Sequence, residues 1–122
     1  AWYLCERQVP GGGCNGRPEK LDDVCYGWWV LASLHILKLE NWLDSKSLQS
    51  FILDCQNIST GGISDHRGAE PDLFHTFFGL ASLSLLQTTI EDCNIITLPS
   101  IDPIYALPNF VVKRLSLPGS TI

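Results

Sequence analysis

The sequence predicts an all-α fold built from helical hairpins that repeat about every 50 residues. Two segments, residues 23–38 and 73–86, are apolar nearly all round, and a third, residues 45–55, is amphipathic with a helical period. The chain also aligns with itself at an offset of 49 residues, which places Gly12 on Gly61. Together these observations indicate buried helices that alternate with half-buried ones.

The internal repeat is seen when residues 12–37 are set above residues 61–86. The matched residues are Gly12-Gly13 with Gly61-Gly62, Asp23 with Asp72, and Leu31-Ala32-Ser33-Leu34 with Leu80-Ala81-Ser82-Leu83. With a one-residue gap, Leu4 to Gln8 falls near Leu53 to Gln56. About 50 residues accommodate two helices and a long loop, so we expect repeats at about residues 1–38 and 45–87.

The three main helices differ in their expected burial. A helix that is apolar all round must be buried on most faces, which we expect for residues 23–38 and 73–86. Residues 45–55 instead carry one apolar stripe at the spacing i, i+3, i+4, i+7, formed by Leu48, Phe51, Ile52 and Cys55. Either Asp44 or Ser45 can cap the start of that helix.

The order of these helices indicates an α-α toroid, in which amphipathic outer helices surround a ring of buried inner helices. Residues 2–5 would be the end of an earlier outer helix, and the glycine-rich loops 10–20 and 57–70 would connect outer helices to inner ones. The chain holds fewer hairpins than a closed ring needs. We therefore expect an incomplete toroid, the C-terminal part of one domain over residues 1–122, with low stability on its own.

The pattern weakens after the second apolar helix, and we expect an irregular tail over residues 92–122. Three prolines interrupt it, at Pro99, Pro103 and Pro108. A short helix is predicted from about residue 108 to 115, because proline is favoured in a first helical turn. Residues 116–122 should be frayed.

Composition excludes several classes of protein. The formal net charge of −5 argues against nucleic-acid binding, which requires a basic surface. No apolar run reaches the roughly 18 residues of a transmembrane segment. The five cysteines show no disulfide-framework spacing, which favours reduced thiols and a cytoplasmic location. The sequence contains no methionine, so we interpret it as a piece of a longer protein.

Asp23, Cys25 and His75 form a candidate metal site. Asp23 and Cys25 cannot share one face inside a regular helix, but both can turn toward one point at a helix start. The repeat places His75 opposite Tyr26, and neighbouring inner helices of a ring begin at the same rim. A carboxylate, a thiolate and an imidazole are typical of a catalytic zinc site with an open fourth position, and a helix N-terminus would favour the thiolate of Cys25. Alternatively, these are three unrelated structural residues.

A second candidate site precedes the first apolar helix. Arg17 and Lys20 are two of the few basic residues, and Tyr26 follows in the first helical turn. A guanidinium, an ammonium and a phenol hydroxyl near a helix start can hold a diphosphate. The alternative is a solvated loop with scattered charge. His66, in the second glycine-rich loop, could approach a ligand or simply be exposed.

Aromatic residues concentrate on the two apolar helices, at Trp28, Trp29, Phe74, Phe77 and Phe78. Within a ring, the inner faces of such helices line a central cavity. Trp29 and Phe74 flank the candidate metal site, so they could form the wall of a lipid pocket. Plain core packing is the alternative and should hold for some of the five.

Long stretches of the chain resemble one known family. The stretches are Cys5-Glu6-Arg7-Gln8, Gly12-Gly13-Cys14-Asn15-Gly16-Arg17-Pro18-Glu19-Lys20-Leu21-Asp22-Asp23-Val24-Cys25-Tyr26-Gly27-Trp28-Trp29, Cys55-Gln56 and Asp72-Leu73-Phe74-His75-Thr76. They closely resemble the β subunits of Rab geranylgeranyltransferases, within the protein prenyltransferase family. The likeness runs from about residue 2 to about residue 90 and resumes faintly at residues 104–108.

The resemblance implies zinc-dependent transfer of a geranylgeranyl group from geranylgeranyl diphosphate to C-terminal cysteines of Rab GTPases. It implies that the catalytic Zn²⁺ is bound by Asp23, Cys25 and His75, that the diphosphate is bound by Arg17, Lys20 and Tyr26, and that the isoprenoid channel is lined by Trp29 and Phe74. In this family the nucleophile is a substrate cysteine, so Cys25 would be a ligand. The implied partners are a prenyltransferase α subunit and a Rab escort protein that presents Rab.

Two departures from that family stand near the implied site. Asp22 replaces a proline of the relatives, and residues 64–70 differ from the family's acidic, proline-containing loop. We expect the 122 residues alone to be inactive, because the amino-terminal half of the fold is not among them. The alternatives are a non-catalytic or truncated helical-repeat interaction module, and a CaaX-type prenyltransferase β subunit. A degenerate module would be expected to lose a member of the metal triad, and all three residues are present.

Overall fold

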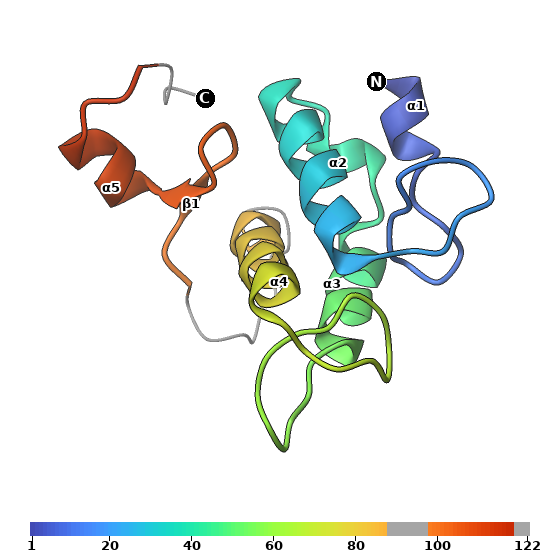
Figure 1. Ribbon diagram of the computed structural model, residues 1–122. Coiled ribbons are helices and arrows are strands. Elements are labelled where there is room, and N and C mark those ends of the chain that lie inside the picture. Colours follow the sequence, from blue (N-terminus) through green and yellow to red (C-terminus); the bar gives the residue numbers. More distant parts are fainter. Residues whose placement is uncertain (88–97, 119–122) are drawn as a thin grey trace.

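The computed structural model describes residues 1–87 and 98–118, and this part of the chain is mostly helical (Figure 1). Its elements in chain order are α1 (Trp2–Cys5), α2 (Val24–Ile36), the 3₁₀ helix η1 (Glu40–Trp42), α3 (Ser45–Asp54), α4 (Leu73–Leu86), β1 (Ile101–Asp102), β2 (Leu107–Pro108) and α5 (Asn109–Arg114). The helices predicted at residues 23–38, 45–55 and 73–86 are thus confirmed. None of the described helices combines the length and the apolar character required to cross a lipid bilayer.

The centre of the fold is the contact between α2 and α4, which lie side by side (Figure 1). Val24, Leu31 and Leu34 of α2 are fully buried, and Leu86 at the end of α4 is as well. Each helix begins with an aspartate cap: Asp23 for α2 and Asp72 for α4. The two helices therefore start in the same manner after equivalent loops.

Helix α3 covers one side of this pair with its apolar stripe. Leu48, Phe51 and Ile52 are buried, as the helical spacing predicts, while the remaining residues of α3 keep some exposure. Of the two candidate caps, Asp44 is the one used, since its carboxylate accepts a hydrogen bond from the Ser47 amide at 3.0 Å. The prediction of one amphipathic helix between two more deeply buried helices is confirmed.

The internal repeat appears as matching backbone hydrogen bonds in the two glycine-rich loops. In the first loop the Asp23 amide donates to the Cys14 carbonyl at 3.0 Å, and in the second the Asp72 amide donates to the Ile63 carbonyl at 3.4 Å. The repeat alignment places Cys14 on Ile63 and Asp23 on Asp72, so these two hydrogen bonds are equivalent. The two loops therefore bring their aspartates to the helix starts along equivalent paths.

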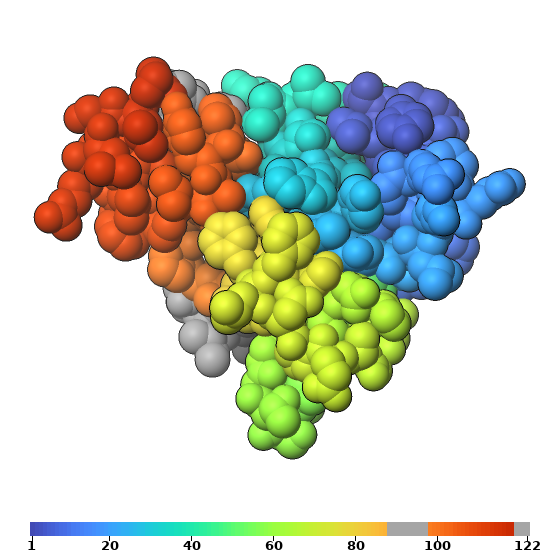
Figure 2. Space-filling model, in the orientation of Figure 1, coloured from blue at the N-terminus to red at the C-terminus, as the bar shows by residue number. Residues whose placement is uncertain are grey.

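The expectation that both apolar helices are buried on most faces is wrong at one end of the pair. Leu73 is 90% exposed, and Phe74, Phe77 and Leu80 are about half exposed. On the other helix Trp29 is 47% exposed. The space-filling view shows α4 (yellow) and α2 (cyan) together on an open surface (Figure 2). No described element packs over this face, so apolar composition here does not produce burial.

The C-terminal segment contains one element that was predicted and one that was not. The short helix α5 follows Pro108 as expected. The strands β1 and β2 form a two-residue antiparallel pair, closed by a turn in which the buried Asp102 carboxylate accepts hydrogen bonds from the amides of Ile104 and Tyr105. Residues 92–97 and 119–122 of the expected irregular tail lie outside the described residues.

Candidate metal centre and anion cleft

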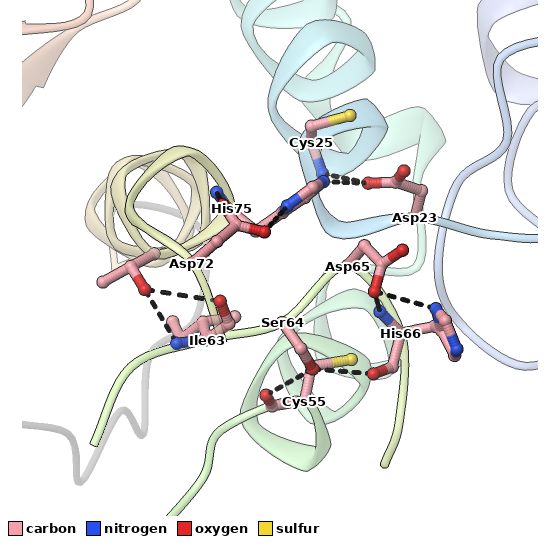
Figure 3. A network of polar contacts seen from close by, with 10 residues as sticks. Asp23, Cys25, Cys55, Ile63, Ser64, Asp65, His66, Asp72 and His75 are labelled. Atoms are coloured by element: carbon pink, nitrogen blue, oxygen red, sulfur yellow. Dashed lines mark hydrogen bonds and ion pairs between the residues drawn. The ribbon is translucent and has the colours of Figure 1, made fainter. Parts of the chain in front are cut away.

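Asp23, Cys25 and His75 converge where α2 and α4 begin (Figure 3). Each offers one ligand atom, and these three atoms lie within 4.8 Å of one another. The Asp23 Oδ1 to His75 Nε2 distance is 3.2 Å, and the side chains of these two residues are 29% and 16% exposed. The convergence required by the sequence-based hypothesis is therefore present, although metal binding itself stays a prediction.

The first turn of α2 explains how two residues so close in sequence face the same point. Asp23 has extended backbone angles, φ −150° and ψ 136°, so its side chain folds back over the helix start. Its Oδ1 accepts a hydrogen bond from the Cys25 amide at 2.8 Å. This capping bond holds the carboxylate beside the cysteine, and the same oxygen faces the imidazole of His75.

Asp72 orients the third residue of the triad. Its Oδ1 accepts a hydrogen bond from the His75 amide at 2.8 Å, and its Oδ2 lies 2.6 Å from the ring Nδ1. These two bonds from His75 hold the pKa of the Asp72 carboxyl below its usual range. With a cation bound and Nδ1–H donating to the Asp72 carboxylate, the lone pair of Nε2 would be available to the metal beside Asp23 and Cys25.

Asp72 was not among the predicted site residues, although the sequence held a signal for it. The repeat alignment places Asp72 on Asp23, which had been assigned as both cap and ligand. The equivalent position in the second repeat keeps the capping role. Asp72 is not one of the candidate ligands; its carboxylate is hydrogen-bonded to His75, three residues further along the chain.

The prediction that the helix start favours a Cys25 thiolate is wrong for the protein without a cation. Burial and then the neighbouring Asp23 carboxylate raise the pKa of the Cys25 thiol to about 12. The hydrogen bond from the Tyr26 amide acts in the opposite direction but is outweighed. A divalent cation bound to the sulfur would reverse this balance, because it stabilises the thiolate directly.

The donor set fits a zinc ion. One thiol sulfur, one imidazole nitrogen and one carboxylate oxygen match the ligands that zinc takes, and three protein ligands leave one position of a tetrahedral ion open. Cys25 is only 8% exposed, which limits the access of bulk water to the sulfur. The site can therefore hold a cation and still receive one further ligand from a substrate.

A cleft of about 670 Å³ adjoins the triad at Asp23. The predicted anion-binding residues Arg17, Lys20 and Tyr26 all line it. The other lining residues are Gly16, Glu19, Leu21, Asp22, Asp65 and His66. The structure thus brings the three predicted residues into one cavity beside the metal triad. Asp22, which the sequence analysis noted as an aspartate in place of the family's proline, lines the same cavity.

The predicted lipid-wall residues Trp29 and Phe74 lie outside that cleft, on the open face of α2 and α4. Phe78 joins them: its ring centroid is 4.8 Å from that of Trp29 and 4.9 Å from that of Phe74. Phe77 extends the cluster at 5.1 Å from Phe78. Such an aromatic surface suits an apolar chain, and Phe78 is the residue through which its two sides are connected.

We expect Asp72→Asn to lower the zinc affinity of the chain by about tenfold or more, as losses of orienting carboxylates typically do. The asparagine keeps an acceptor for the His75 amide, but its side-chain NH₂ favours the tautomer that carries the proton on Nε2, where no lone pair remains for a metal. Zinc affinity can be measured by competition with a chromophoric chelator.

The matched control for this variant is Asp44→Asn, the same change at the cap of α3. It should leave zinc affinity unaltered, since its carboxylate caps another helix. Equal affinities for the Asp72→Asn variant and the unmodified chain would show that the aspartate does not orient the histidine.

Comparison with known proteins shows which family the chain resembles along most of its length. A family model described as the prenyltransferase alpha-alpha toroid domain matches residues 1–107. The geranylgeranyl transferase type-2 subunit beta of Saccharomyces cerevisiae is 50% identical over 113 residues, which are 93% of this chain and 33% of that protein. The type-2 subunit beta 1 of Arabidopsis thaliana is 53% identical over 114 residues, again 93% of this chain and 33% of the relative.

A solved structure supports the same fold. The Candida albicans protein geranylgeranyltransferase-I, solved in complex with GGPP, is similar with a TM-score of 0.82 at 28% identity. The match covers 93% of this chain and 35% of that one. The predicted α-α toroid is therefore confirmed, and the chain spans about a third of the length of the curated relatives it matches.

Proposed function

This chain belongs to the prenyltransferase alpha-alpha toroid family, and we propose on that basis that it is the zinc-binding part of a type-2 geranylgeranyltransferase β subunit. The reaction we propose is the transfer of a geranylgeranyl group from geranylgeranyl diphosphate to C-terminal cysteines of Rab GTPases. The observation that carries this proposal is the convergence of Asp23, Cys25 and His75 within 4.8 Å beside a cleft that holds Arg17 and Lys20.

In this proposal the chain supplies the metal ligands and the leaving-group site. Zinc, when held by the three ligand residues, supplies a Lewis acid that lowers the pKa of a substrate thiol. Arg17 and Lys20 bind the diphosphate and stabilise the negative charge that grows on it as the carbon–oxygen bond breaks. The Tyr26 hydroxyl donates a hydrogen bond to the same group. Cys25 is a ligand and does not attack the prenyl carbon.

The open aromatic face would receive the prenyl chain. Trp29 and Phe74 present exposed rings on either side of Phe78. Contact with an isoprenoid would remove these rings from water, and burial of apolar area favours binding by about 25 cal/mol per Å². The proposal thus gives a role to apolar side chains that the described residues leave exposed.

The proposed partners follow from the relatives' names and from the sequence resemblance. A subunit named beta implies a second subunit, so we propose an α subunit as the stable partner. A Rab escort protein that presents Rab, and a cytoplasmic location, stay predictions from the sequence.

A second candidate acceptor is a CaaX-type C-terminus. The type-1 subunit beta of Arabidopsis thaliana is 37% identical over 86 residues, which are 70% of this chain and 22% of that protein. The type-2 relatives are more similar over more of the chain, so we favour the Rab-type acceptor. A non-catalytic interaction module is the remaining candidate, and the intact triad argues against it.

The proposal can be tested by grafting these residues in place of the matching third of the Saccharomyces cerevisiae relative and co-expressing the chimera with that protein's α subunit. We expect the chimera to transfer labelled geranylgeranyl to a Rab protein presented by its escort protein, and not to a CaaX peptide. The Cys25→Ser chimera should show less than about a hundredth of that rate, since one metal ligand is lost.

The chain of 122 residues, assayed alone, should show no turnover. A chimera that folds and binds zinc, yet transfers nothing to either acceptor, would favour the interaction module. Transfer to the CaaX peptide alone would favour the type-1 activity.

A further inference from the structure

We propose that His66, oriented by Asp65, is a further diphosphate-binding residue in the cleft that contains Arg17 and Lys20. This inference rests on the proposed function, because it assigns one more residue to the same leaving-group site. His66 belongs to the second glycine-rich loop, and its side chain lines the same cleft as Arg17 and Lys20.

The main chain around His66 is firmly placed against the start of α2. The Val24 amide donates a hydrogen bond to the Asp65 carbonyl at 2.9 Å, directly beside the metal triad. The fully buried Ser64 hydroxyl lies 2.7 Å from the His66 carbonyl and 3.0 Å from the Cys55 carbonyl. The loop is thereby tied to α2 on one side and to the end of α3 on the other.

The ring of His66 is also held in place, as Figure 3 shows. Its Nδ1 lies 2.8 Å from Asp65 Oδ1, and the same oxygen accepts the His66 amide at 2.9 Å. With Nδ1–H donating to the carboxylate, Nε2 is the atom left for a ligand. The side chain is 57% exposed and lines the cleft, so a ligand can reach it. A protonated ring would donate an N–H from Nε2 to an anion.

The charges of the cleft make a third cation important. The ionisable residues that line the cleft with His66 are Asp65 beside it, Arg17, Glu19, Lys20 and Asp22 in the segment before α2, and Asp23 and Tyr26 at the start of α2. Two permanent cations thus stand against four carboxylates. A protonated His66 would neutralise Asp65 and reduce the excess of carboxylates over cations in the metal-free cleft from two to one.

The test is calorimetric titration of the 122-residue chain with inorganic diphosphate, in metal-free buffer at pH 6.5 and constant ionic strength. We expect His66→Gln to weaken binding by about tenfold, the typical loss for one hydrogen bond to a charged group. His66→Arg should bind at least as tightly as the unmodified chain.

Three further variants separate this inference from the proposed function. Arg17→Ala and Lys20→Ala should each weaken diphosphate binding, and His35→Gln, at the far end of α2, should not. If His66→Gln binds as the unmodified chain does while Lys20→Ala is weakened, the role of His66 is refuted and the leaving-group site stands. If the unmodified chain does not bind diphosphate, or if none of the cleft variants changes binding, both assignments fail. Thermal unfolding of each variant, followed by circular dichroism and compared with that of the unmodified chain, would confirm that the variants are folded.

Discussion

Replacing His75 with alanine is expected to lower the zinc affinity of the chain by more than about a hundredfold. Even the loss of a residue that only orients a metal ligand typically lowers metal affinity ten- to a hundredfold, and His75 is itself a ligand in this proposal. His75 contributes the only nitrogen of the triad and the only ligand from α4. Without it, Asp23 and Cys25 would remain as two ligands on one helix start. The raised pKa of Cys25, about 12, would then oppose metal binding with no imidazole to compensate.

Zinc bound per chain, measured by mass spectrometry after dialysis against a fixed free zinc concentration, would check this expectation. His35→Gln is a suitable control, because it also removes an imidazole from the chain but at a residue outside the triad. We expect one zinc per chain for the unmodified protein and for the control, and close to none for His75→Ala. Full occupancy of the His75→Ala variant would refute the metal centre.

Gly12→Ala should lower the free energy of unfolding by about 3 kcal/mol or more. Gly12 has φ +92°, which side chains other than that of glycine rarely tolerate, and a Cβ at this position would stand 2.4 Å from the carbonyl oxygen of Ser47. That oxygen belongs to the backbone of α3, so it cannot move aside as a flexible side chain would. The change would therefore push the first glycine-rich loop away from α3.

The repeat supplies a matched control in Gly61. This residue is the equivalent of Gly12 and has a similar φ of +80°, but a Cβ there would meet nothing within 4 Å. Gly61→Ala should therefore cost only the backbone term, about 1–2 kcal/mol. Chemical denaturation of both variants measures the difference. Equal losses of unfolding free energy would mean that the contact with α3 contributes little.

Most of the fold could be predicted from the sequence, because the patterns that specify it are local and occur in both repeats. The apolar periodicity defined α3 and α4 to within a residue, and Asp23 marked the start of α2 correctly, while Asp44 was one of two candidate caps for α3. The offset between the two loops also predicted that Asp23 and His75 would meet, although they are 52 residues apart in the chain. Because both residues lie at the starts of equivalent helices, the repeat made their long-range contact predictable from local sequence.

Three features escaped prediction for physical reasons. The pKa of Cys25 depends on burial and on the distance to Asp23, which no spacing reveals. The hydrogen bond of Asp72 to the His75 ring depends on a rotamer, since both residues read equally well as a cap and its first turn. The exposure of Phe74 and Leu80 depends on which neighbours surround the helix, and apolar composition cannot show whether such neighbours are present.

The hydrogen bond from the Val24 amide to the Asp65 carbonyl links the two helical repeats at the candidate metal centre. A loop of the second repeat satisfies a backbone donor at the helix start of the first, at the same seam where the second repeat contributes His75. In an isolated hairpin, water would replace this hydrogen bond and at least one of the three ligands would be missing. The candidate metal centre therefore requires two adjoining repeats, which hold its ligands jointly.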